Sequence, residues 1–195
     1  VTDVIEILKA EFGKQSALTV RRGKIHDYLG IKFDFSKAGK VVMTMADYIS
    51  ELIEETPDDL FKGTPTSPAG NYLMNVNPDC KRLDSETAVM YHHLTVKLLY
   101  LAKRVRPDLQ TAVSFLCTRV QNPDEDDWKK LGRCLTFLRN TKDDPFTLAA
   151  DGSCAIRWWV DASYAVHPDM KSHTGATMSL GQGCVYSMSC KQKLN

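Results

Sequence analysis

The chain has 195 residues, of which 43% are hydrophobic, and its formal charge is +1. This length suits one large domain or two small ones with a buried core, and the near-neutral charge excludes binding to nucleic acid through overall charge alone. Basic residues are nevertheless clustered, because residues 1–43 hold eight Lys or Arg against five acids and residues 81–121 hold seven against three, whereas residues 44–59 hold six acids and no base. Nucleic-acid binding is therefore expected only at these two basic zones.

The six cysteines show no Cys-x-x-Cys spacing, and the sequence has neither a signal peptide nor an apolar run long enough to span a membrane. We therefore expect reduced thiols in an intracellular protein that does not cross a membrane. The sequence starts at Val1 and ends at Asn195 without a closing element. Both ends are expected to lie within a longer protein.

Hydrophobic periodicity predicts a helix over residues 2–13 with one buried face, formed by Val4, Ile5, Leu8 and Phe12. Residues 18–22, 25–35 and 41–45 are rich in β-branched and aromatic residues, which predicts a three-stranded meander. Gly30 falls inside the second of these strands, where glycine indicates a bulge or a close approach by another backbone.

Helical spacing resumes over residues 46–55, with acids on the outer face. Residues 56–80 then contain four prolines and two glycines, a composition typical of an extended connector. A connector of this length is unusual inside a compact domain, so we place the main domain boundary here.

Three helices are predicted next, from Asp84 or Ser85 to Lys103, from Pro107 to Val120, and from Asn122-Pro123 to about Leu138. The acidic run at residues 124–127 lies in the first turns of the third helix, where negative charge favours the helix dipole. We interpret it as a helix-start feature rather than as a metal site. Cys117 and Cys134 lie near positions of these helices that face the core, and we interpret both as small core residues.

The final sheet is predicted to start with strands at residues 148–150 and 155–160, followed by a hairpin of residues 174–180 and 184–189 about Gly181–Gly183. The run from Arg157 to Val160 is expected to be buried and leads to Asp161. An aspartate at a strand end is a common metal ligand, although it is also often a turn or cap residue.

Two histidines near Asp161 suggest a different site, in which Asp161, His167 and His173 bind a transition metal. Their spacing matches no known ligand pattern. We therefore favour the interpretation of His173 as a histidine of a surface loop.

Several stretches, taken in order, carry a resemblance to a known family. They are residues 27–31 (DYLGI), Tyr91 with residues 98–102 (LLYLA), residues 106–109 (RPDL) with 112–113 (AV), residues 135–139 (LTFLR), 160–165 (VDASYA), 171–175 (KSHTG) and 189–192 (SCKQ). Together they are similar to the reverse-transcriptase and ribonuclease H region of a copia-type retrotransposon polyprotein. The resemblance covers nearly the whole chain.

The departures from the family pattern limit what the resemblance implies. The polymerase motif Tyr-Val-Asp-Asp does not occur, His92-His93 replaces the usual Arg-x, and Lys97 stands where glycine is common. The family's further ribonuclease H acids would follow Asn195. The fragment alone is therefore expected to be catalytically inactive.

The resemblance implies an α+β fold that combines a reverse-transcriptase palm-end β meander, a three-helix bundle like a thumb or connection, and the opening strands of a truncated ribonuclease H-like domain. The implied divisions are residues 1–56 for the palm end, 57–83 for the connector, 84–145 for the helical segment and 146–195 for the ribonuclease H part.

In the intact parent, the resemblance implies RNA-directed DNA synthesis and cleavage of the RNA strand of a hybrid, both dependent on Mg²⁺. Asp161 matches the first metal-binding aspartate of the family and would be the catalytic ligand of an incomplete site. The implied partners are an RNA/DNA hybrid or primer-template and the rest of the Pol polyprotein, in a cytoplasmic particle, the nucleus or both.

Two groups of residues are predicted to contact nucleic acid. The first combines the segment that grips the primer in related polymerases with nearby bases, namely Arg21, Arg22, Lys24, Leu29, Gly30, Ile31 and Lys32, and the second consists of Lys103, Arg104 and Arg106. Basic residues clustered at helix ends also stabilise the helix dipole and increase solubility, so such clusters can have other roles than binding nucleic acid. The alternatives are a non-catalytic nucleic-acid-binding or scaffold remnant of a decayed element and an unrelated metal-binding protein.

Overall fold

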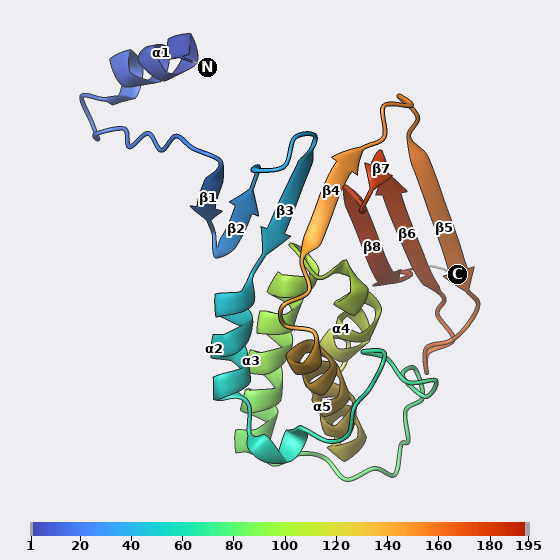
Figure 1. Cartoon of the computed structure of the whole chain (residues 1–195). Coiled ribbons are helices and arrows are strands. Elements are labelled where there is room, and N and C mark those ends of the chain that lie inside the picture. Colours follow the sequence, from blue (N-terminus) through green and yellow to red (C-terminus); the bar gives the residue numbers. More distant parts are fainter. Residues whose placement is uncertain (1, 194–195) are drawn as a thin grey trace.

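The computed structural model of the chain describes residues 2–193 and has a mixed α+β architecture with two antiparallel sheets. The order of the elements is α1 (Thr2–Phe12), β1 (Ile25–Tyr28), β2 (Ile31–Asp34), β3 (Lys40–Thr44), α2 (Ala46–Glu55), η1 (Asp58–Leu60), α3 (Ser85–Ala102), η2 (Pro107–Leu109), α4 (Gln110–Cys117), α5 (Glu125–Asn140), β4 (Phe146–Ala150), β5 (Arg157–Ser163), β6 (His173–Ser179), β7 (Gly181–Gln182) and β8 (Tyr186–Lys191). Figure 1 shows α2 to α5 grouped below the two sheets, while α1 stands apart.

The core is built mainly by helices α3, α4 and α5, as their apolar periodicity predicts. Leu94, Leu98 and Leu101 of α3 are fully buried, and Leu131 and Leu135 of α5 are buried as completely. The Tyr91 hydroxyl lies in the same core and donates a hydrogen bond to the Leu116 carbonyl at 3.0 Å, so its polar end is paired. Cys134 is buried and Cys117 packs against the core, which confirms both as core residues.

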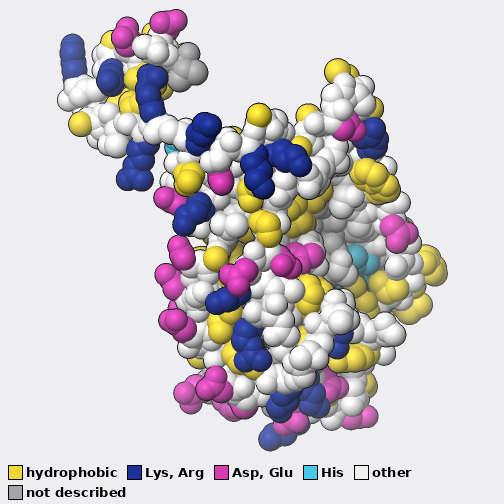
Figure 2. Space-filling view, in the orientation of Figure 1, with side chains coloured by type: hydrophobic (Ala, Val, Ile, Leu, Met, Phe, Trp, Pro, Cys, Tyr) yellow, Lys and Arg dark blue, Asp and Glu magenta, His cyan; other side chains and the backbone are white. Residues whose placement is uncertain are grey.

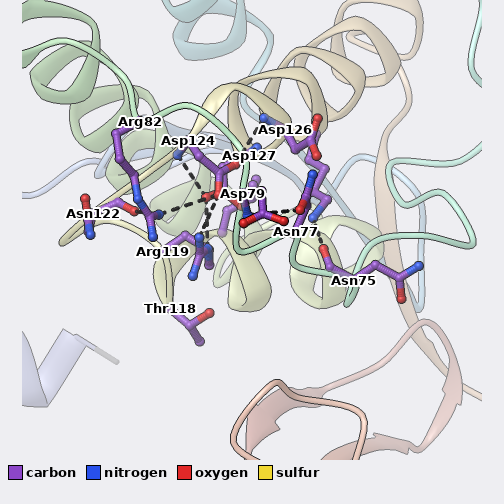
Figure 3. A network of polar contacts seen from close by, with 12 residues as sticks. Asn75, Asn77, Asp79, Arg82, Thr118, Arg119, Asn122, Asp124, Asp126 and Asp127 are labelled. Carbon is purple, nitrogen blue, oxygen red and sulfur yellow. Dashed lines mark hydrogen bonds and ion pairs between the residues drawn. The ribbon is translucent and has the colours of Figure 1, made fainter.

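The acidic run before α5 forms a capping box, which confirms its interpretation as a helix start. The Asp124 side chain accepts from the backbone N–H groups of Asp126 and Asp127, and the Asp127 side chain accepts from the Asp124 N–H. Arg119, two residues after α4, pairs with both carboxylates at 2.9 Å. Figure 3 shows Arg119 beside Asp124 and Asp127. The run therefore joins α4 to α5.

The first sheet has the strand order β1-β2-β3-β4-β7 and corrects three predictions. Residues 18–22 form no strand. Gly30 does not lie in a bulge, because Leu29 and Gly30 have φ of 52° and 73° and form the turn between β1 and β2. Strand β4 does not start the final sheet, since it pairs with β3 along residues 40–43.

The proline-rich connector packs along α5. Leu60 and Leu73 of the connector are buried in the same hydrophobic core as residues of α2 and α3. Gly132 makes this packing possible, because a Cβ at this position would lie 2.9 Å from the Leu60 carbonyl oxygen. The segment before the connector and the helices after it therefore share one core.

The second sheet has the order β5-β6-β8, and β8 packs against α4. The predicted antiparallel pairing of the last two strands is confirmed by the register of Met178 opposite Tyr186. The link between them is not a tight hairpin, because residues 181–182 leave this sheet and pair with β4.

Two predictions of burial are wrong. Every residue of β5 is exposed, and Trp158 and Trp159 each keep 55% of their surface accessible, because β5 is an edge strand with β6 as its one neighbour. Helix α1 forms as expected but contains no buried residue. Both elements carry hydrophobic side chains that the described part of the chain leaves uncovered.

Candidate nucleic-acid and metal site

Asp161 lies near the end of the exposed edge strand β5, opposite Gly175 of β6. Its Oδ1 accepts a hydrogen bond from the Ala162 backbone N–H at 2.9 Å. The residue lines a cavity of about 480 Å³ between the second sheet and the start of α4, to which Thr111, Trp159 and Ser189 also contribute. Asp161 is accessible, and an exposed strand rather than the expected buried one positions it.

The residues around Asp161 do not complete a magnesium site. Magnesium prefers an octahedron of oxygen ligands and usually takes one or two carboxylates. Ribonuclease H chemistry requires several carboxylates around two ions. Over residues 2–193, no three side chains of His, Cys, Asp or Glu lie close enough together to hold a metal ion. Asp161 alone therefore fits at most one position of such a site.

His167 and His173 are buried side by side at one end of a chain of polar groups, so the surface-loop interpretation of His173 is wrong. His173 is part of strand β6 and His167 is 3% exposed. The Nε2 atom of His167 lies 3.0 Å from Nδ1 of His173, whose own Nε2 lies 2.7 Å from Oγ of Ser189. The Ser189 hydroxyl in turn contacts Thr111 Oγ1 at 3.3 Å.

The surroundings lower the pKa of both imidazoles. Burial lowers the pKa of His167, and the charge of Lys191 lowers it further, whereas Asp169 opposes the change. Burial also lowers the pKa of His173, and the neighbouring His167 lowers it further. Within the described residues no third ligand joins the two rings, so the proposed Asp161, His167 and His173 metal site is not formed.

The first group of predicted nucleic-acid contacts divides into exposed and buried residues. Arg21, Arg22 and Lys24 are exposed in the segment between α1 and β1, and Lys32 is exposed in β2. Leu29 presents its side chain at the tip of the β1–β2 turn. Ile31 is instead a buried core residue, which corrects its expected role as a surface contact.

Tyr100 connects the β1–β2 turn with the second basic group. Its hydroxyl donates to the Leu29 carbonyl at 2.8 Å, and the guanidinium of Arg104 lies 4.5 Å from the centre of its ring. Lys103 follows directly after α3 and is also exposed. Tyr100 therefore brings the turn and Arg104 close together in space, although 71 residues separate Leu29 from Tyr100 in the sequence. Sequence reasoning included Tyr100 only as part of a family motif.

Arg106 is not available to nucleic acid. Its side chain is 4% exposed and forms an ion pair with Asp108 at 2.7 Å. It also donates to the carbonyl and hydroxyl oxygens of Thr141 at the end of α5. A buried guanidinium paired in this way stabilises the junction between η2 and α5, and this role replaces the predicted surface contact.

No helix within residues 2–193 is both long enough and apolar enough to cross a bilayer.

The six cysteines are free thiols, in agreement with the absence of a Cys-x-x-Cys motif.

Two sequence relatives come from transposons. The chain is 24% identical over 172 residues to a putative transposon Ty5-1 protein of Saccharomyces cerevisiae, covering 87% of this chain and 54% of the relative. It is 28% identical over 170 residues to a retrovirus-related Pol polyprotein from transposon RE2 of Arabidopsis thaliana, covering 87% of this chain and 11% of the relative. The chain is a homologue of retrotransposon Pol polyproteins.

A third relative matches half of the chain. It is the secreted RxLR effector protein 161 of Plasmopara viticola, which is 30% identical over 97 residues, or 49% of this chain and 68% of the relative. The matched part of the chain and this protein belong to one family. No protein-family profile matches the chain, and no solved structure does.

The chain thus spans 54% of the yeast relative and 11% of the plant polyprotein. It corresponds to a part of a transposon polyprotein.

Proposed function

We propose that the chain is the part of a copia-type retrotransposon polyprotein that links the end of a reverse transcriptase to the first strands of ribonuclease H. In this proposal the β1–β2 turn, Lys103 and Arg104 hold the phosphate backbone of an RNA/DNA hybrid or primer-template. The intact parent would carry out RNA-directed DNA synthesis and ribonuclease H cleavage in a cytoplasmic particle or the nucleus.

The observation that carries the proposal is the contact of Tyr100 with both groups of predicted nucleic-acid residues. The resemblance assigns a nucleic-acid role to the Leu29-Gly30 turn, and charge clustering independently indicates Lys103 and Arg104. The hydrogen bond of Tyr100 to Leu29 and the stacking of Arg104 on the Tyr100 ring support this proposal, because they join the turn to the second group. A surface that combines a glycine turn with two cations suits a phosphate backbone, because the turn permits close approach and the cations replace counterions.

Asp161 would contribute one ligand to a metal site that needs further carboxylates from the polyprotein. Because one carboxylate cannot hold two ions, the chain by itself should bind a hybrid without cleaving it. Incubation of the chain with an RNA/DNA hybrid and Mg²⁺ should therefore leave the RNA strand intact on a denaturing gel. Cleavage that survives Asp161→Asn would show contamination, whereas cleavage that Asp161→Asn abolishes would contradict the proposed inactivity.

The binding surface is tested with the variant Lys103→Ala/Arg104→Ala. We expect a fluorescently labelled RNA/DNA hybrid to bind the chain with a linear dependence of log affinity on log salt concentration. The double substitution should reduce that slope by about 2, because each removed phosphate contact accounts for about one unit. Fluorescence anisotropy at several salt concentrations measures both affinity and slope.

The matched control is Lys81→Ala/Lys129→Ala, which also removes two exposed cations. Lys81 lies shortly before the start of α3 and Lys129 lies near the start of α5. Lys103 and Arg104 instead follow the end of α3. The control should retain the slope of the unmodified chain. Equal losses in both variants would mean that general charge, and not the surface around Tyr100, attracts the hybrid.

A further inference from the structure

Helix α1 carries a hydrophobic stripe that no part of residues 2–193 covers. At about 100° per residue, Val4, Leu8 and Phe12 project from one side of the helix, and all three are exposed. Figure 2 shows hydrophobic side chains of this helix at the surface, apart from the body of the molecule. A stable amphipathic helix of this length normally buries such a stripe, because short isolated helices are marginal in water.

The first sheet carries an apolar groove on the same molecule. Residues of β3, β4 and the segments around β7 line it and enclose about 410 Å³. Phe35, Leu180 and Val185 form exposed walls, and Val41 and Leu148 lie between them. Small residues, Gly39 and Ala149 among them, also line the groove.

The charges of the two surfaces are complementary. Lys37 and Lys40 border the groove. Glu11 lies at the edge of the stripe of α1, and the helix as a whole contains three acids and one base. A helix that places its apolar stripe in the groove would bring opposite charges together at the rim.

The tether between α1 and β1 ends at the groove. The Phe35 backbone N–H, on the groove wall, donates to the Lys24 carbonyl at 2.7 Å, so the last residue of the tether lies beside the groove. Residues 13–24 span at most about 40 Å when extended, whereas the three strand spacings from β1 to β4 amount to only about 15 Å. A short tether also raises the effective concentration of α1 to the order of mM, so that weak contacts are sufficient.

We propose that α1 folds back along its tether and packs its apolar stripe into the groove formed by β3, β4 and the β7 segments of the same chain. The groove would then be closed to other partners while α1 is bound. The tether includes Arg21, Arg22 and Lys24 of the first predicted nucleic-acid group, but the inference does not use their charges and stands independently of the proposed function.

The proposal is tested by site-specific photo-crosslinking of the full chain, with p-benzoylphenylalanine in place of Phe12. Mass spectrometry of the irradiated protein should find Phe12 attached to the groove segments, near Phe35, Leu148 or Val185. The substitution Val185→Asp puts a charge in the apolar contact and should reduce this crosslink at least about tenfold. The substitution Leu8→Asp on α1 should have the same effect.

Val96→Asp is the matched control, because Val96 on α3 is 50% exposed, Val185 is 51% exposed, and Val96 does not line the groove. It should leave the crosslink unchanged, and circular dichroism should show that all three variants keep their helices. Attachment at other sites, insensitivity to Val185→Asp, or crosslinks found only between two chains would each overturn the proposal.

Discussion

Helix α3 and strand β5 are both rich in large hydrophobic residues, but the structure treats them in opposite ways. Leu94, Leu98 and Leu101 of α3 are completely buried because α4 and α5 pack against this helix. Trp158 and Trp159 of β5 remain half exposed because β5 has β6 as its one neighbour in the sheet. The hydrophobic composition of a segment therefore does not show whether the segment is buried within this chain. That depends on whether other elements of the chain pack against it.

The largest effect is expected from Arg119→Ala in the helical region. Arg119 pairs with Asp124 and Asp127, whose side chains are 2% and 1% exposed. Its loss would leave buried Asp127 without this ion pair and Asp124 with only the longer pair to Arg82 at 3.6 Å. Burial alone would lower the pKa of Arg119, but the pairs with Asp127 and Asp124 outweigh burial and raise it. We expect the free energy of unfolding to fall by about 3–5 kcal/mol, measured by urea denaturation.

The control for this effect is Lys129→Ala, which removes an ion pair with Asp126 at the surface of the same helix. Exposed pairs contribute at most about 1 kcal/mol. A loss as large as that of Arg119→Ala would show that the burial of the Arg119 cluster is not what makes it important.

A smaller effect is expected from pH in the second sheet. The pKa of both His167 and His173 lies below the ordinary value of 6.5 in the folded chain, so the unfolded chain binds protons first as the pH falls. Stability from this pair is therefore complete above about pH 6.5 and decreases below it. The carboxyl groups with lowered pKa, such as those of Asp84 and Glu55, also contribute stability to the folded chain. That contribution is lost only as the pH falls below their ordinary pKa values of 3.8 and 4.5.

The urea midpoint should therefore decrease between pH 7 and pH 5, and His167→Phe should flatten this decrease. His92, an exposed histidine of α3, provides the control, since His92→Asn should leave the pH profile unchanged. An unaltered profile in His167→Phe would mean that other groups cause the decrease.

The smallest effect is expected from Trp159→Ala in β5. Because the side chain is already half exposed in this chain, its loss should change the free energy of unfolding by less than about 1 kcal/mol. Leu135→Ala in α5 removes a smaller but fully buried side chain and should cost about 3 kcal/mol. A larger loss for Trp159→Ala than for Leu135→Ala in thermal or urea unfolding would break the comparison between the two regions.

The helices could be predicted because their signals are local. Asp84 caps α3, Asp124 and Asp127 begin α5, and the apolar residues that follow recur at helical spacing. The sheets were predicted less well, because strand pairing joins residues far apart in sequence. Nothing in residues 146–150 indicates that they pair with residues 40–43 rather than with the strands that follow.

The candidate site divides in the same way. Sequence reasoning identified Asp161, the Leu29-Gly30 turn and the bases Lys103 and Arg104 from residue type and resemblance. It could not foresee that Arg106, which follows them by two residues, is buried against Asp108. It also missed Tyr100 as the contact between the two groups, since a tyrosine in a helix gives no signal of its partner.

By itself, the sequence determined the mixed α+β class, the three helices after the connector, the caps of α3 and α5, and the local concentration of basic charge, because these depend on neighbouring residues. Tertiary structure alone decided that β5 is an exposed edge, that His167 and His173 are buried together, and that Tyr100 joins the turn to Arg104. The physical reason is that burial and contact depend on what else packs against a residue. A sequence pattern indicates which secondary structure a residue prefers, but it does not indicate which residues will lie next to it in the folded chain.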